Sequence, residues 1–278
     1  MPQLRSGGAT LADTDTGVPG GVPDAPTALF GHGLMFGGWM FRSQIAALRD
    51  TYRCISLDWR GQGRSPRARD GYDMDTLTED VLNLMDSLGT GPVHYVGLSM
   101  GGFVGMRLGA RHPHALRSLS LLATTADGLR PERVRQFRQF AVVHRLVGLR
   151  PVRRRAAALA LSPGFPRSPA GRPLLAEWEQ RVRRGSRTGL ARAARAVADH
   201  PPVADELHRI TAPTLVLVGA EDVSTPPADA EAIAARVAGA RLRAIVGAGH
   251  TPTLEQPAAV SLHLREFLTE VDRHQQRP

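Results

Sequence analysis

The sequence predicts an α/β fold with a mostly parallel central sheet, flanking helices and a helical lid inserted between two strands. Three observations support this prediction. Short apolar runs alternate with amphipathic segments, which is the pattern of parallel strands joined by helices. The 278 residues, 42% hydrophobic and 22% charged, suit a soluble α/β protein. An arginine-rich segment interrupts the alternation, so residues 125–209 are expected to form the lid and residues 1–124 and 210–278 the core.

The first elements follow from periodicity. Residues 16–26 read as a loop between irregular N-terminal strands and the main sheet. Residues 26–33 are an apolar run that ends in glycine, and residues 40–50 have helical spacing. Residues 52–58 predict the next strand. The segment 75–89 is an amphipathic helix, because one face carries Leu77, Val81, Leu84 and Leu88.

The alternation continues on both sides of the inserted segment. Before it come a strand at 92–98, a helix at 100–112 and a strand at 115–123. The insertion is helical, with a proline- and glycine-rich loop at 162–173. After it, strands and helices return at 212–219, 228–239, 240–247 and 258–271. An insertion of this kind lies over the carboxyl ends of parallel strands, where open α/β sheets bind ligands.

The positive charge is concentrated in the predicted lid. The net charge is +9 and every one of the 35 basic residues is arginine; residues 125–209 hold 18 of them against 7 acidic residues. This segment has few aromatic residues and no nucleic-acid motif, so we expect a solvated helical surface and no nucleic-acid binding. Two functional interpretations remain open: steering of an anionic substrate and docking of an acidic partner protein.

The composition also limits location and chemistry. Cys54 is the single cysteine, so neither an intrachain disulfide nor a cysteine metal site is expected. No window approaches the roughly 18 apolar residues of a membrane span, and the first residues do not resemble a secretory signal. We therefore expect a cytoplasmic protein without a membrane partner. Asp58 and Arg60 are expected to hydrogen-bond loop backbone, and no metal or cofactor site is predicted.

The stretch "YVGLSMGGFVG" places Ser99 between Gly97 and Gly101, where a predicted strand meets a predicted helix. A strained strand-to-helix corner exposes a serine hydroxyl, and glycines on both sides relieve the clashes that side chains would make there. The pattern predicts a nucleophile at the amino end of a helix, where the dipole favours negative charge.

A serine hydroxyl needs a base, and the base needs an acceptor that fixes its tautomer. Among the ten histidines, His250 follows the last predicted strand in a turn of small residues. Asp222 follows the preceding strand and is the expected partner of His250. Glu221 is the nearest competitor, although an aspartate holds the imidazole closer, and Asp127 is a third choice.

The segment "LFGHGLMFGGWMF" supplies the remaining predicted parts of the site. The backbone N–H groups of Leu34 and Met100 are expected to form an oxyanion hole. His32, in the same segment, suits a loop-shaping role better than that of a base. Candidate pocket residues are aromatic side chains here and in the predicted lid, each of which could equally belong to the lid core: Phe36, Trp39, Phe137, Phe140, Phe165 and Trp178.

Five motifs in register resemble the α/β-hydrolase superfamily, and in particular its esterase and lactonase branch: "GHG", "DWRGQGRS", "GLSMGG", "GAEDVSTP" and "GAGHTPTLEQP". The resemblance covers about residues 27–271, and the "GLSMGGFVGMRLGARHP" helix is similar to 3-oxoadipate enol-lactonase-like proteins. It implies the chain order Ser99, Asp222, His250 for nucleophile, acid and base. The arginine-rich lid departs from the family.

The resemblance implies a serine hydrolase that cleaves a carboxylic ester or a lactone through an acyl-enzyme. Two alternatives stay open: a C–C hydrolase or cofactor-free perhydrolase or haloperoxidase with the same triad, and a non-catalytic ligand- or partner-binding protein. Ser99 speaks against epoxide hydrolases and haloalkane dehalogenases, which carry aspartate there, and against dienelactone-type hydrolases, which carry cysteine. If lid arginines face the entrance, anionic substrates should bind in a salt-dependent way; the candidates are Arg153, Arg154, Arg155, Arg183 and Arg184. The sequence does not indicate an oligomeric state.

Overall fold

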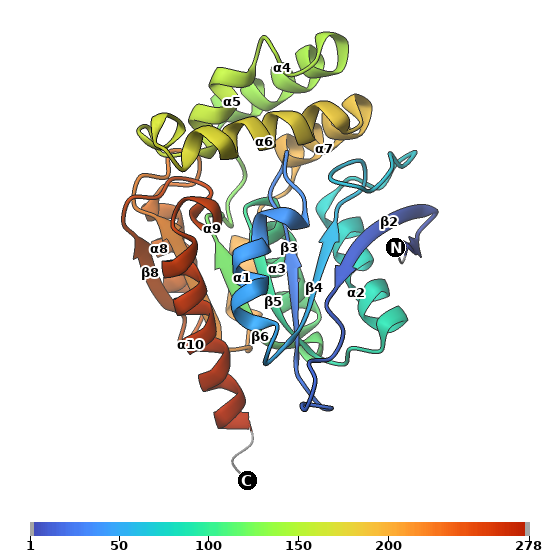
Figure 1. Ribbon diagram of the computed structural model, residues 1–278, viewed down its shortest axis with the longest axis vertical. Helices are drawn as coiled ribbons and strands as arrows, with labels where there is room; N and C mark the ends of the chain where they lie inside the picture. The colour runs from blue at the N-terminus through green and yellow to red at the C-terminus, as the bar shows by residue number, and fades with distance from the viewer. Residues whose placement is uncertain (1–2, 276–278) are drawn as a thin grey trace.

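One eight-stranded sheet runs through the centre of the computed structural model, which describes residues 3–275 (Figure 1). From edge to edge the strands follow the order β1 (Gln3–Ser6), β2 (Ala9–Asp15), β4 (Arg53–Asp58), β3 (Thr27–Gly31), β5 (Val93–Leu98), β6 (Leu116–Leu122), β7 (Thr214–Gly219) and β8 (Arg241–Ile245). Strands β4, β3, β5, β6, β7 and β8 are parallel. Their carboxyl ends therefore meet at one edge of the sheet.

The N-terminal strands are more regular than the sequence suggested. β1 and β2 form an antiparallel hairpin, and β2 continues the sheet by pairing antiparallel with β4. The turn consists of Gly7 and Gly8, both with positive φ, and two-residue hairpin turns of this kind require such a conformation. The glycine pair was the available signal for this hairpin.

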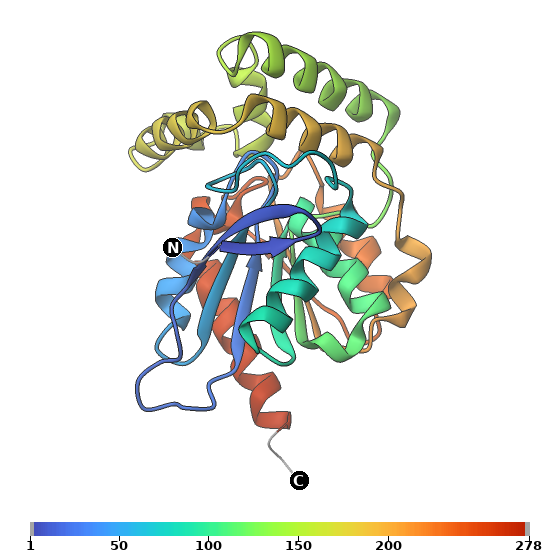
Figure 2. The ribbon, with the colours of Figure 1, turned by 90° about the vertical axis from the view of Figure 1, so that its right-hand side faces the viewer.

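Helices cover both faces of the sheet (Figure 2). One face packs against α2 (Met74–Leu88), α3 (Met100–Arg111) and α8 (Pro227–Arg236), and the other against α1 (Arg42–Leu48) and α10 (Pro257–Gln275). The apolar face predicted for 75–89 turns inward, since Leu77, Val81 and Leu84 are buried. Helix α2 begins at the side chain of Asp73, which accepts from the Thr76 N–H, and ends at Gly89 with φ 58°.

Four helices lie between β6 and β7 in the chain and form a layer above the carboxyl edge of the sheet (Figures 1 and 2). They are α4 (Pro131–Val147), α5 (Arg153–Ala160), α6 (Gly171–Arg184) and α7 (Arg187–Asp199). Pro131 starts α4, and the Ser186 side chain caps α7 by accepting from the Gly189 N–H at 3.1 Å.

Short helical turns connect these elements: η1 (Gly38–Phe41), η2 (Pro113–Ala115), η3 (Phe165–Arg167), η4 (Ala204–Arg209) and α9 (Pro252–Glu255). The predicted mostly parallel sheet flanked by helices is confirmed. Within residues 3–275, no helix is both long enough and apolar enough to cross a bilayer.

Candidate active site

Ser99 occupies the sharp turn between β5 and α3. Its φ of 52° and ψ of −111° lie in a region that residues with side chains rarely adopt. A Cβ on Gly97 would collide with the backbone oxygen of Gly101, and a Cβ on Gly101 with that of Gly31. The two glycines around the serine are therefore required for the close approach of helix α3 to the sheet.

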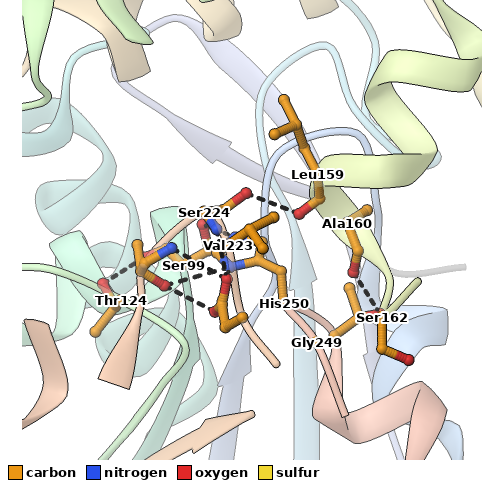
Figure 3. Close-up of polar contacts among 12 residues, drawn as sticks. Ser99, Thr124, Leu159, Ala160, Ser162, Val223, Ser224, Gly249 and His250 are labelled. Atoms are coloured by element: carbon orange, nitrogen blue, oxygen red, sulfur yellow. Dashed lines mark hydrogen bonds and ion pairs between the residues drawn. The ribbon is translucent and has the colours of Figure 1, made fainter. Parts of the chain in front are cut away.

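The nucleophile, base and acid predicted from the sequence lie in one hydrogen-bonded chain. His250 Nε2 is 2.9 Å from Ser99 Oγ, and His250 Nδ1 is 2.8 Å from Asp222 Oδ2. A carboxylate can only accept, so Nδ1 carries the proton and Nε2 is left to accept from the serine hydroxyl. Figure 3 shows Ser99 and His250 close together, with dashed lines marking the hydrogen bonds at this point. The arrangement matches that of a nucleophile with its general base.

Asp222 is held in its ionised form. Its Oδ1 accepts from the backbone N–H groups of Ser224 (2.7 Å) and Thr225 (3.1 Å), and the Thr225 hydroxyl donates to Oδ2 at 3.0 Å. Burial acts to raise the pKa of Asp222, but His250 and the hydrogen bonds outweigh it and hold this pKa below its ordinary value. The charged carboxylate can therefore stabilise an imidazolium formed at His250.

The competing acids lie elsewhere. Glu221 is exposed, and Asp127 is exposed after β6 with its N–H donating to the Thr125 hydroxyl. His32 is buried and has a loop-shaping arrangement: its Nε2 accepts from the Trp59 N–H at 3.0 Å, and its Nδ1 is 2.7 Å from the Gly33 oxygen. Burial lowers the pKa of His32, so its ring is neutral.

A second serine–histidine–aspartate chain lies away from the lid. His94 Nδ1 is 2.8 Å from Ser118 Oγ, and its Nε2 is 3.1 Å from Asp272. His94 and Ser118 are fully buried near the amino ends of their strands, so no substrate reaches them. Tyr52 and Arg117 also donate to Asp272, which ties α10 to the sheet. This second chain is structural.

The predicted oxyanion donors come from two segments beside Ser99. Leu34 lines the cavity that contains Ser99, and Met100 is the first residue of α3, where the backbone N–H has no acceptor within the helix. Gln62, which the sequence reasoning did not single out, links the segments: its Oε1 accepts from the Met35 N–H at 2.9 Å and its Nε2 is 3.8 Å from Met100 Sδ. Gln62 is buried and flanked by glycines, and this pattern could have drawn attention to it.

A cavity of about 300 Å³ opens over Ser99 and His250 beneath the lid. Its wall is mostly apolar and includes four of the predicted pocket residues: Phe36, Phe137, Phe140 and Trp178. The lid helices α4, α5 and α6 all contribute to this wall. A cavity of this size with a mostly apolar wall suits a small molecule.

Two predicted pocket residues lie outside this cavity. Trp39 lines a separate groove of about 670 Å³, because its ring is held by the guanidinium groups of Arg42 (5.5 Å) and Arg181 (4.8 Å). Phe165 belongs to η3, where its backbone approaches Gly171 too closely for any Cβ there, and its ring packs into the lid. Aromatic character alone does not distinguish residues that line the cavity from residues that pack within the lid.

The lid arginines differ in whether they form ion pairs, line the cavity over Ser99 or line the groove at Trp39. Glu179 pairs with Arg153 (2.9 Å) and Arg183 (3.0 Å), so these two do not face the entrance as free charges. Arg184 lines the groove at Trp39, and Arg154 lines neither space. Among residues 3–275, Arg155 and Arg133 are the arginines in the wall of the cavity over Ser99, and Arg133 donates to the Val223 oxygen at 2.6 Å. Of the five arginines expected at the entrance, only Arg155 lines the cavity.

The loop after β4 shows no metal-site character. Asp58 accepts from the Gly38 N–H at 2.6 Å and from the Arg64 guanidinium, while Arg60 forms a buried ion pair with Asp80 at 2.7 Å. Across residues 3–275, histidine, cysteine and acidic side chains form no group of three that could hold a metal ion.

Comparisons with known proteins find relatives of similar sequence and similar fold. A family model described as alpha/beta hydrolase fold matches residues 26–257. A protein of Acinetobacter baylyi named 3-oxoadipate enol-lactonase 2 is 32% identical over 240 residues, covering 86% of this chain and 87% of that protein. A thermophilic esterase from Thermogutta terrifontis superposes with a TM-score of 0.88 at 29% identity, covering 97% and 98% of the two chains. The enol-lactonase from Burkholderia xenovorans gives a TM-score of 0.88 at 27% identity, covering 96% and 100%.

Proposed function

The chain belongs to the alpha/beta hydrolase fold family and is a hydrolase, and from this premise we propose that it cleaves a carboxylic ester or a lactone through an acyl-enzyme at Ser99. The observation that carries the proposal is the chain of hydrogen bonds from Ser99 through His250 to Asp222, with distances of 2.9 and 2.8 Å. The names of the enol-lactonase and esterase relatives support the ester and lactone class.

The geometry suits two half-reactions. His250 Nε2 takes the hydroxyl proton while Ser99 Oγ forms a bond to the substrate carbonyl carbon, and the carbonyl oxygen becomes an oxyanion beside the N–H groups of Leu34 and Met100. The intermediate collapses, the bond to the leaving alkoxide breaks, and His250 returns the proton to that oxygen. In the second half-reaction, His250 takes a proton from water while the water oxygen forms a bond to the acyl carbon. The bond to Ser99 Oγ then breaks, His250 returns the proton to that oxygen, and the carboxylic acid is released. In a lactone, both products remain one molecule.

The direct test is Ser99→Ala measured with an activated nitrophenyl ester. We expect turnover to fall by about 10³-fold or more, because the nucleophile and its activation by His250 are lost together. The thermal midpoint should stay close to that of the unmodified protein. Persistence of turnover in the variant would contradict the proposal. If the unmodified protein hydrolyses no ester, a substrate panel would separate C–C cleavage, perhydrolysis and ligand binding without catalysis.

We further propose that the substrate carries an anionic group. Arg155 has no hydrogen-bond or ion-pair partner within residues 3–275, and it lines an otherwise mostly apolar cavity. A guanidinium there could bind a carboxylate at the end of the substrate remote from the ester. An acidic partner protein that delivers the substrate is the second way in which the lid charge could act.

A matched pair of nitrophenyl esters tests this charge preference, one with a neutral acyl chain and one of equal length ending in a carboxylate. Arg155→Ala should lower kcat/KM for the anionic ester by about tenfold, the lower range for a charged hydrogen bond, and leave the neutral ester unchanged. The KM of the anionic ester should rise with ionic strength. An equal loss for both esters, or a flat salt response, would remove the charge preference and leave the ester hydrolysis intact.

A further inference from the structure

The C-terminal end of lid helix α5 is joined to the two loops that carry Asp222 and His250. The Leu159 oxygen accepts from the Ser224 hydroxyl at 2.7 Å, and the Ala160 oxygen accepts from the Thr251 hydroxyl at 3.0 Å. Figure 3 shows Leu159 and Ala160 beside these loops. Ser224 is two residues after the catalytic acid, and Thr251 directly follows the base. The lid is therefore fastened to the triad loops themselves.

Glu255 completes this junction. The residue is only 6% exposed, and its Oε2 accepts from the Ser162 N–H of the lid at 2.7 Å. Its Oε1 accepts from the backbone N–H groups of Gly249 (3.0 Å) and Thr251 (3.3 Å), and it lies 3.2 Å from the Thr251 hydroxyl, whose one proton it shares with the Ala160 oxygen. One carboxylate thus holds the residue before His250, the residue after it, and the lid.

The backbones at this junction are tightly packed. A Cβ on Gly249 would lie 2.5 Å from the Ser162 nitrogen and 2.8 Å from the Leu161 carbonyl carbon, so the loop of the base presses directly on the lid backbone. Arginine and histidine side chains of residues 3–275 form no ion pair with Glu255, whose hydrogen-bond donors there are backbone N–H groups and the Thr251 hydroxyl. Its role here is therefore one of hydrogen-bond geometry.

The same lid segment also touches the substrate space. Leu159 and Ala160 line the cavity over Ser99 on one side, and their carbonyl groups hold Ser224 and Thr251 on the other. If this segment moved by as little as an ångström, both the cavity wall and the loop that carries His250 would move with it. When a catalytic group is misplaced by about an ångström, the reaction rate can fall by about 10²-fold.

We propose that Glu255 is a positioning residue for the proposed hydrolysis: it keeps His250 at Ser99 by fastening the loop of the base to the docked lid segment Leu159–Ser162. This proposal rests on the assignment of His250 as the base. It extends the functional unit from the three triad residues to the end of α5. The lid then supports the catalytic geometry in addition to forming the cavity wall.

Glu255→Gln tests the contact with Ser162 of the lid separately from the contacts beside His250. An amide has one acceptor oxygen, which stays with the Gly249 and Thr251 N–H donors on either side of His250, and its NH₂ group then meets the Ser162 N–H donor to donor. The variant therefore breaks the lid contact and keeps the shape. We expect kcat for a small activated ester to fall by about tenfold with KM within twofold of the unmodified value. Concentrations of active enzyme are taken from titration with a fluorophosphonate, which corrects for any unfolded fraction.

A matched control and a spectroscopic readout make the result specific. Glu266→Gln, at an exposed position of α10 outside the junction, should leave kcat unchanged. The low-field proton NMR signal of the His250 Nδ1–H bonded to Asp222 should shift or broaden in Glu255→Gln and stay in place in the control. Should Glu255→Gln fail to fold, Thr251→Val removes the hydroxyl contacts to Ala160 and Glu255 with a similar shape, and the same fall in kcat is expected.

Two results would overturn the positioning role. One is a kcat per active site equal to that of the unmodified protein. The other is a lower thermal midpoint with unchanged kcat and an unchanged NMR signal, since that is the behaviour of a residue that only stabilises the fold. Failure of the proposed function looks different, because the unmodified protein would then hydrolyse no ester or Ser99→Ala would hydrolyse it equally well.

Discussion

Replacing Asp222 with asparagine exchanges one carboxylate oxygen for an NH₂ group and reverses the direction of one hydrogen bond. The Oδ1 atom of Asp222 accepts from two backbone N–H groups at 2.7 and 3.1 Å, and these donors cannot turn away. The asparagine oxygen should therefore take the Oδ1 position. Its NH₂ group then occupies the Oδ2 position, 2.8 Å from His250 Nδ1. Two donors cannot share that contact, so the Nδ1 proton must move to Nε2.

The cost follows from this change of tautomer. A proton on Nε2 faces Ser99 Oγ, 2.9 Å away, and the ring can no longer accept the hydroxyl proton. The same substitution in another serine–histidine–aspartate triad lowers kcat by about 10⁴-fold, roughly 5.5 kcal/mol of transition-state stabilisation. We expect a loss of this order here, with KM changed little because Asp222 does not line the cavity.

The assay is kcat and KM for a nitrophenyl ester near neutral pH, with Glu221→Gln as the control. Glu221 is the exposed neighbour of Asp222, and its substitution should leave both constants unchanged. A loss of less than about tenfold in Asp222→Asn would refute the reasoning. A larger loss in Glu221→Gln would transfer the role of the acid to Glu221.

Two further predictions concern the fold that carries the site. Gly101→Ala should destabilise the protein by about 1–3 kcal/mol and slow fluorophosphonate labelling of Ser99, because its Cβ collides with the Gly31 backbone oxygen; thermal unfolding and labelling rates check this, and an unchanged labelling rate would contradict it. Asp272→Asn should lower the free energy of unfolding by about 1–3 kcal/mol at neutral pH, through the contacts with His94, Tyr52 and Arg117. Burial acts to raise the pKa of Asp272, but these partners hold it below its ordinary value; the stabilisation is therefore present above the unfolded pKa of about 3.9 and lost as the pH falls through the folded pKa. Denaturant titrations at several pH values should show the difference between the two proteins shrinking below about pH 4, and a difference that grows there would contradict the sign.

The triad residues predicted from sequence share one property: each lies at or shortly after the carboxyl end of a strand. Ser99, Asp222 and His250 come after β5, β7 and β8, and parallel strands bring their carboxyl ends to one edge. The alternation of apolar runs and helices therefore sufficed for the sheet and for the order of the candidate residues. The hydrogen-bond distances needed the structure.

The features that escaped prediction depend on contacts between distant segments. Gln62 bridges two loops, and Glu255 meets Ser162, which lies 93 positions away in the chain. Trp39 and Phe36 are three residues apart and equally aromatic, and both line the groove, yet only Phe36 also lines the cavity over Ser99. The pairing of Glu177 with Arg181 and of Glu179 with Arg183 did have a local signal, since both pairs have the four-residue spacing of helical neighbours.

The central claim is that Ser99 forms a covalent acyl-enzyme with His250 as its base. The most direct measurement is the intact mass of the protein, quenched in acid within the first turnovers of a slowly hydrolysed activated ester. The account predicts a mass increase of one acyl group, located on the peptide that contains Ser99 and missing from Ser99→Ala. Rapid product formation without this adduct, or an adduct on another residue, would contradict it.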